Sequence, residues 1–390
     1  MTPLSPPEGH SQIGRSQMLA ETPTRRPAPP SPCQSGGKGV GGIGGHPDVE
    51  LLRGLVAIPS TSGNEVDAVH YLVEQMTARG FRAWVDRAGS AVGEIGSGPR
   101  RVVLLGHIDT VPGEIPVRIE EGVLHGRGSV DAKGPLATFV AAASRAAARL
   151  NATVTVVGAV GEETIGSPGA TEVATWPAPD LCMIGEPSGW DAVCLGYRGT
   201  LSLHYKLTQD SRHTAGPGES VGERAVGFWN ALVAEIATRS QGATGGTFNL
   251  ITPALRAFNT TGDGLRDVAT LSIGLRLPPG VDVADLLVRL RDLAGDAELR
   301  VDGCQAGYRS DKRSPLVPPF LRAIRAEGGE PRFTVKLGTS DMTVVGPAWA
   351  CPIVAYGPGD AALDHTPEER IVLDEYLAAV RVLAEVLAAL

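Results

Sequence analysis

Short apolar runs alternate with helical patterns through the first half of the chain, and this alternation restricts the fold more than any other feature. One run covers residues 102–105, and an Ala-rich helical pattern extends from Pro135 to about Leu150. Two further runs cover residues 153–160 and 180–185. Such runs are typical of parallel strands that connecting helices bury on both faces. The pattern therefore predicts an α/β fold with a mostly parallel sheet.

The middle of the chain has a different pattern. Residues 200–207 and 270–277 alternate between apolar and polar, as half-exposed strands do, and residues 298–304 predict a last strand. Helical periodicity covers residues 221–237 and 281–293. This β-α-β-β-α-β-like order predicts a small α+β domain whose sheet has one open face.

These patterns predict one catalytic domain that is interrupted by an insertion. We expect the catalytic domain to consist of residues 47–198 and 309–390, and residues 199–308 to form an inserted lid. Residues 1–46 contain eight prolines and nine glycines and show no periodic apolar pattern. This composition predicts a disordered N-terminal extension outside the fold.

Charge and cysteine content exclude several classes of protein. A net charge of -8 and an aromatic content of 5% argue against a nucleic-acid-binding surface. The five cysteines have no CxxC spacing, which argues against a cysteine zinc site and predicts a reducing, cytoplasmic location. No apolar run approaches the roughly 20 residues that a membrane span needs. We therefore expect neither nucleic acid nor membrane as a partner.

Histidines and carboxylates gather in five loops, most of them directly after predicted strands. Ligand sites of open α/β sheets lie at the carboxyl ends of strands, so these side chains are expected to converge. Each loop alone has a simpler explanation, since Asp131 could cap a helix and Glu162 and Glu163 could be a solvated pair. Together the loops supply a ligand set that suits zinc, cobalt or manganese: His107, Asp131, Glu163, Glu186 and His365. With one bridging carboxylate, this set could hold two ions about 3.5–4 Å apart.

The same motifs, in the same order, resemble those of a known enzyme family. They are GHIDTVP (106–112), GRGSVDAKG (126–134), GEE (161–163), GEPS (185–188) and the late His365. This set is similar to the co-catalytic zinc family of aminoacylases, acetylornithine deacetylases, succinyl-diaminopimelate desuccinylases and glutamate-type carboxypeptidases. The resemblance covers about residues 48–390. It implies a hydrolase that cleaves a carbon–nitrogen amide bond with two divalent metal ions, Zn²⁺ first and Co²⁺ as the alternative.

The resemblance also implies a role for each ligand residue. Asp131 would bridge the two ions, His107 and Glu186 would complete one site, and Glu163 and His365 the other. Asp109 would orient the imidazole of His107. Glu162 would be the general base, which takes a proton from the attacking water and passes it to the leaving amine.

The insertion contains a further resemblance, to the family's lid. The sequence SRHTA (211–215) is similar to a lid motif whose histidine reaches the partner's active site, so His213 would stabilise the oxyanion in trans within a homodimer. An exposed loop histidine is the alternative. For substrate binding, the resemblance indicates Thr200, Gly338, Thr339 of GTSD (338–341), and a carboxylate-binding Arg276. An exposed charge on a strand is the alternative for Arg276. Asn259, on the loop that precedes the strand of Arg276, and Arg256 are further candidates.

Three phrases point to one branch of the family. They are GYRGT (196–200), FNTT (258–261) and YGPGD (356–360), which leads to LDHTPE (363–368). They resemble a branch in lysine biosynthesis that releases lysine, or ornithine in arginine biosynthesis, from a LysW-type amino-group carrier protein. There the amino acid is joined through its α-amino group to the side-chain carboxyl of the carrier's terminal glutamate. Arg309, Lys312 and Arg313 are candidates for docking an acidic carrier, and a solvated charged loop is the alternative.

Other activities stay open at this point. The same ligands would serve a deacetylase of N-acetyl-ornithine or N-acetyl-lysine, or a succinyl-diaminopimelate desuccinylase. A family member that binds ligand without turnover is a further alternative, although the presence of Glu162 and all five metal ligands argues against it.

Overall fold

The computed structural model describes residues 45–213 and 215–390. The extension predicted over residues 1–46 therefore lies, apart from its last two residues, outside the described residues. Thr214 of the lid motif lies outside them as well.

A nine-stranded sheet forms the larger part of the described chain. Its strand order is β1-β2-β6-β3-β7-β15-β8-β13, and β14 pairs with β8. The central neighbours β6, β3, β7 and β15 are parallel, whereas β1, β2 and β13 pair antiparallel at the two sides. This confirms the prediction of an α/β fold with a mostly parallel core. The strands are β1 (Arg82–Val85), β2 (Ala91–Ile95), β3 (Arg100–His107), β6 (Ala152–Ala159), β7 (Leu181–Gly185), β8 (Ala192–Tyr197), β13 (Tyr308–Arg309), β14 (Arg332–Lys336) and β15 (Ile353–Ala355).

Helices cover both faces of this sheet, which explains the uninterrupted apolar run at residues 102–105. Val102 and Leu104 belong to one buried core, and Val103 and Leu105 belong to another on the opposite face. The first core includes α1 (Pro47–Val56), α2 (Val66–Ala78), α3 (Lys133–Ala146), α7 (Val317–Ala326) and α9 (Leu373–Ala388). The second includes α4 (Pro168–Ala174) and α8 (Met342–Trp349). A small sheet of β16 (Arg370–Val372), β5 (Val123–His125) and β4 (Arg118–Glu120) lies beside them.

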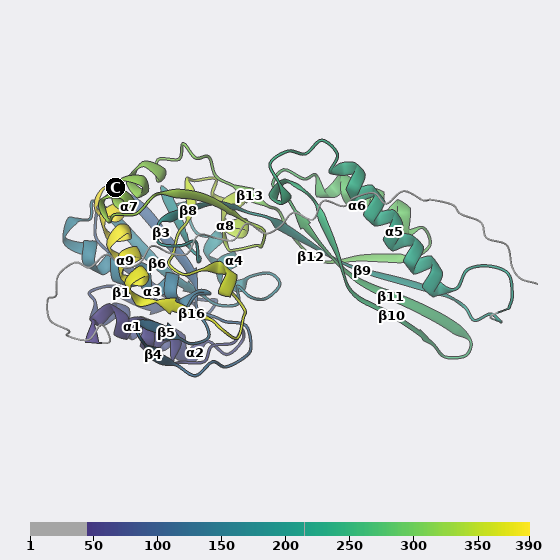
Figure 1. The fold of residues 1–390 in the computed structure, drawn as a ribbon, viewed down its shortest axis with the longest axis horizontal. Coiled ribbons are helices and arrows are strands. Elements are labelled where there is room, and N and C mark those ends of the chain that lie inside the picture. The colour runs from purple at the N-terminus through teal and green to yellow at the C-terminus, as the bar shows by residue number, and fades with distance from the viewer. Residues whose placement is uncertain (1–44, 214) are drawn as a thin grey trace, which may run out of the picture. The chain divides into compact units, whose positions relative to one another are not determined.

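The segment predicted as an insertion forms a second sheet with its own core. Its elements follow the predicted order: β9 (Gly199–Asp210), α5 (Val221–Arg239), β10 (Thr252–Gly262), β11 (Arg266–Leu277), α6 (Val283–Ala294) and β12 (Glu298–Gln305). The strand order is β10-β11-β9-β12, all antiparallel. Alternate residues of β9, from Leu201 to Leu207, are buried, and α5 and α6 lie side by side on one face (Figure 1).

The predicted order includes a strand at the place of β10, but no residue range was predicted for it. Nearly all of its residues are exposed, so it lacks the alternation that identified β9 and β11. The expectation that Asn259 lies on a loop is therefore wrong, because Asn259 pairs with Thr270 within the β10–β11 ladder. The start of helix α5 is fixed by its sequence, because Ser220 and Glu223 form a reciprocal capping box there.

No helix among the described residues is both long and apolar enough to cross a membrane.

Candidate active site

Three of the predicted loops meet because their strands are parallel neighbours. His107 is the last residue of β3, Glu162 and Glu163 follow β6, and Glu186 follows β7. In the register of the sheet, His107 lies opposite Ala159 of β6, and Gly106 lies opposite Gly185 of β7. The carboxyl ends of the three strands therefore reach the same edge of the sheet, as expected for a ligand site of an open α/β fold.

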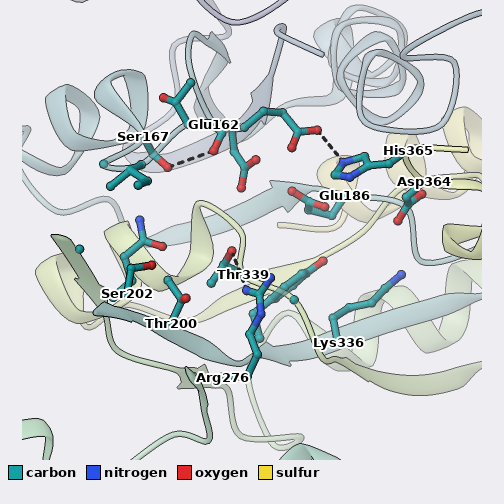
Figure 2. Close-up of a pocket in the computed structure, with 18 of the residues that line it drawn as sticks. Glu162, Ser167, Glu186, Thr200, Ser202, Arg276, Lys336, Thr339, Asp364 and His365 are labelled. Carbon is teal, nitrogen blue, oxygen red and sulfur yellow. Dashed lines mark hydrogen bonds and ion pairs between the residues drawn. The ribbon is translucent and has the colours of Figure 1, made fainter. Parts of the chain in front are cut away.

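Asp131 lies between two histidines that come from distant parts of the chain. Its Oδ1 is 3.1 Å from Nε2 of His107, and its Oδ2 is 2.9 Å from Nε2 of His365. The same nitrogen of His365 is 2.9 Å from Oε1 of Glu163 (Figure 2). Asp131 does not cap α3, whose N-cap is Ala132 without a side-chain hydrogen bond. The carboxylate thus occupies a position shared by both histidines, which is the arrangement that a bridging ligand needs.

Asp109 holds both His107 and the loop of the two glutamates. Nδ1 of His107 is 3.0 Å from the backbone oxygen of Asp109 and 3.4 Å from its Oδ1. The carboxylate also accepts hydrogen bonds from the backbone nitrogens of Glu162 and Glu163, at 3.0 and 3.1 Å, and from Ser62 Oγ at 2.7 Å. Burial alone would raise the pKa of Asp109, but its hydrogen bond with His107 lowers it. The contacts place Asp109 where it can fix the orientation of the imidazole.

The remaining carboxylates lie close to one another, Glu186 buried and Glu162 half-buried. Burial, and then the nearby charges of Asp341, Glu163 and Asp131, raise the pKa of Glu162 well above its usual value. Burial, followed by Asp131 and Glu162, has the same effect on the pKa of Glu186. Carboxylates that repel one another in a buried place either take up protons or bind cations.

The residues therefore fit a pair of divalent cations. Ligand atoms of His107, Asp131 and Glu163 all lie within 4.8 Å of one another. Glu186 Oε1 is 4.0 Å from Nε2 of His107. Within residues 45–213 and 215–390, no lysine or arginine forms an ion pair with these carboxylates. Imidazole and carboxylate donors with this excess of negative charge are the chemistry that zinc and similar ions require.

A cavity of about 630 Å³ opens beside this cluster. Residues of both sheets line it, and four of the predicted substrate contacts are among them: Thr200, Arg276, Gly338 and Thr339. Arg256 also lines the cavity, and Nη1 of Arg276 lies 3.5 Å from Thr339 Oγ1 (Figure 2). Asn259 and His213 are exposed and do not line it.

Two residues that were not predicted, Arg198 and Glu369, form contacts that support the site. Arg198 is 2% exposed and donates to the backbone oxygen of Arg276, at 2.9 Å, and to that of Leu250, at 2.7 Å. Glu369 is 1% exposed and belongs to the same loop as His365. The only sequence signal for Arg198 was its place in the phrase GYRGT, and Glu369 had none beyond following His365.

Glu369 holds the backbone that carries Asp131. Its Oε1 accepts hydrogen bonds from the backbone nitrogens of Val130 and Asp131, at 2.9 and 3.1 Å, and its Oε2 accepts one from Arg127 at 2.7 Å. Since residues 131 and 369 are far apart in sequence, this contact ties two of the ligand loops together.

Comparisons with known proteins agree with this geometry. Residues 103–389 match the family model described as Peptidase family M20/M25/M40. The chain is 46% identical to a [LysW]-lysine hydrolase of Deinococcus radiodurans, over 87% of this chain and 95% of the relative. It is 40% identical to a putative [LysW]-lysine/[LysW]-ornithine hydrolase of Thermococcus kodakarensis, over 88% of this chain and 92% of the relative.

Solved structures of the same fold are more distant in sequence. An M20 family metallo-carboxypeptidase of Sulfolobus solfataricus has a TM-score of 0.70 at 19% identity, over 87% of this chain and 98% of that one. A tripeptidase of Staphylococcus aureus has a TM-score of 0.72 at 19% identity, over 88% and 98% of the two chains. At these identities the likeness concerns the fold.

Proposed function

This chain belongs to peptidase family M20/M25/M40, and from that membership we propose that it releases lysine from a LysW-type amino-group carrier protein. The bond hydrolysed is the amide between the α-amino group of lysine and the γ-carboxyl of the carrier's terminal glutamate. The names of relatives at 46% and 40% identity support this substrate, and the second name includes ornithine as an alternative amino acid.

One observation carries the chemical part of the proposal: Asp131 contacts His107 with one oxygen and His365 with the other. In our proposal Asp131 would be a ligand common to two ions, His107 and Glu186 would complete one site, and Glu163 and His365 would complete the other. Zn²⁺ is the ion we propose, with Co²⁺ as the alternative. When bound, such ions polarise the amide carbonyl and make water acidic enough to be deprotonated near neutral pH.

Glu162 acts as the general base in this proposal. Its backbone nitrogen is held by Asp109, so its carboxylate is presented from a fixed loop toward the cavity. The carboxylate takes a proton from the attacking water and then delivers it to the nitrogen of the departing lysine. Burial, and then the neighbouring carboxylates, raise the pKa of Glu162, while the charge of His107 opposes that effect. A raised pKa suits a carboxylate that must first accept a proton and then give it up.

The segment 199–308 supplies the substrate-binding side of the site. Arg276 and Thr200 extend into the cavity from β11 and β9, and the guanidinium suits a carboxylate of the substrate. We propose that residues 199–308 are a lid and dimerisation domain and that His213 reaches the site of a second copy. The exposed position of His213, outside the cavity of its own chain, is compatible with such a role. Exposed Arg309, Lys312 and Arg313 are proposed contacts for the acidic carrier.

A competition assay tests the function. Purified protein with added Zn²⁺ or Co²⁺ receives carrier-linked lysine, carrier-linked ornithine and free N-acetyl-ornithine in one reaction, and products are quantified by mass spectrometry. We expect preferred release of lysine from the carrier. Preferred cleavage of N-acetyl-ornithine would replace the proposal with a simple deacetylase. Glu162→Gln, which keeps all five proposed ligands, should abolish turnover while metal content is retained.

A further inference from the structure

The cavity contains more cationic groups than one substrate carboxylate needs. Arg256 and Arg276 reach it from β10 and β11, and Lys336 reaches it from the end of β14. The ammonium of Lys336 forms no hydrogen bond or ion pair within the described part of the chain. Figure 2 shows Lys336 and Arg276 as separate groups on the wall that faces Glu162, Glu186 and His365. A partly buried cation without a protein partner, aimed into a substrate cavity, indicates an anionic group on the ligand.

A second unpartnered donor lies next to Lys336. Tyr197 of β8 is its direct cross-strand neighbour, and both side chains line the cavity. Tyr197 is 2% exposed, and its hydroxyl is buried without a hydrogen-bond partner in the structure. The nearby thiol of Cys194 is at most a weak partner. One ammonium and one hydroxyl on adjacent strands are suitable donors for the two oxygens of a carboxylate.

The position of Lys336 indicates which side of the scissile amide it faces. Figure 2 shows Arg276 across the cavity from Glu162, where Nη1 of Arg276 lies 3.5 Å from Thr339 Oγ1. Figure 2 likewise shows the ammonium of Lys336 near Asp364 and His365. Since Glu162 must deliver its proton to the leaving amine, the released amino acid belongs on the side of Arg276. Lys336 then faces the acyl side.

We propose that Lys336, with Tyr197 beside it, binds a carboxylate on the acyl side of the scissile bond. This inference rests on the proposed function, because a γ-glutamyl group keeps its α-carboxylate while its side-chain carboxyl is joined to lysine. Arg276 would bind the carboxylate of the departing lysine. The two cations would then select a substrate with a carboxylate on each side of the amide, which an N-acetyl amino acid lacks.

A matched pair of small substrates tests the inference. The first is the dipeptide in which the γ-carboxyl of glutamate is joined to the α-amino group of lysine. The second is the same molecule with the α-carboxyl of its glutamate converted to an amide, so that only the acyl-side charge is removed. The metal-loaded full chain, Lys336→Met, Lys336→Arg and the control Lys206→Met are compared by kcat/KM. Lys206 is an exposed residue of β9 outside the cavity.

We expect amidation to lower kcat/KM of the unsubstituted enzyme by about 10- to 100-fold, the range for one hydrogen-bonded charge. Lys336→Met should lose a similar factor on the carboxylate substrate and little on the amide. Lys336→Arg should recover part of that loss, and Tyr197→Phe should show a smaller loss with the same substrate dependence. Thermal midpoints and metal content of the variants check that they fold and load normally.

Two other results have distinct meanings. If Lys336→Met lowers kcat/KM by the same factor on both substrates, or on neither, Lys336 does not bind the acyl-side carboxylate. That result would overturn this inference and leave the proposed function standing. If the unsubstituted enzyme hydrolyses neither dipeptide nor the carrier-linked lysine, the proposed function is overturned and the inference falls with it.

Discussion

Replacing Glu369 with alanine removes one buried carboxylate and three hydrogen bonds at once. Two of the donors are the backbone nitrogens of Val130 and Asp131, and the third is the guanidinium of Arg127. Val130 is fully buried and the Arg127 side chain is 14% exposed, so solvent has little access to the donors left behind. Removing one partner of a buried ion pair typically costs 3–5 kcal/mol. We therefore expect Glu369→Ala to lower the free energy of unfolding by about 3–5 kcal/mol.

Glu369→Gln separates the backbone contacts from the ion pair. The amide oxygen of glutamine can take the place of Oε1 and accept both backbone hydrogen bonds, while the amide nitrogen cannot accept from Arg127. The expected loss is about 1–3 kcal/mol, the value of one charged hydrogen bond. Urea unfolding in the presence of a chelator measures both variants, and exposed Glu368→Ala serves as the neighbouring control.

Metal affinity provides a readout that general destabilisation would not produce. Because Glu369 fixes the backbone of Asp131, we expect the dissociation constant for Zn²⁺ to rise about 10- to 100-fold in Glu369→Ala, measured under conditions where the variant is folded. The role of Glu369 as the support of Asp131 would be refuted by either of two results. One is a free energy of unfolding of Glu369→Ala within about 0.5 kcal/mol of that of the unsubstituted protein, and the other is an unchanged affinity for Zn²⁺.

Three further predictions follow from the cluster. Asp131→Ala should lose most of the bound metal and all activity, and retained stoichiometric metal by elemental analysis would contradict the bridging role. Burial raises the pKa of Asp341 to about 7 and of Asp364 to about 8, above their unfolded values. In chelator, these two groups therefore stabilise the fold at low pH, and that contribution is lost as pH rises through about 7–8. Once the two carboxylates are ionised, a bound cation offsets their charge. Metal addition should therefore raise Tm more at about pH 9 than at about pH 6. An equal gain at both pH values in calorimetry would be contrary to this reasoning. Mixing inactive His213→Ala with inactive Glu162→Gln should restore part of the activity if His213 acts in trans; no recovery despite demonstrated subunit exchange would argue against it.

Local periodicity determined most of the elements that could be read from the sequence. The apolar runs became β3, β6 and β7 because helices cover both faces of the central sheet, and the alternating run at residues 200–207 became β9 because only one face of that sheet is covered. The residue range of strand β10 could not be predicted, because its residues are mostly exposed and need not alternate between apolar and polar. In each case the pattern of apolar and polar residues follows the burial of that one strand, so a short stretch of sequence is enough to predict it.

The ligand loops were also readable, because each lies at a fixed place relative to its own strand. The sequence motifs therefore indicated His107, Glu163 and Glu186 before their strands were known to be neighbours. The contact of His365 with Asp131, at 2.9 Å, agreed with a family pattern and not with any local feature of the chain.

Tertiary structure alone decided which side chains surround the cluster. Lys336 and Tyr197 become neighbours only when β14 pairs with β8, and Glu369 reaches the backbone of Asp131 only when the loop before α9 returns to the start of α3. Asn259, by contrast, lies on a strand outside the cavity. The periodicity of apolar residues predicts how a residue is buried within its own element. A contact with a residue far along the chain depends on strand pairing and loop closure, which the neighbouring residues in sequence do not indicate.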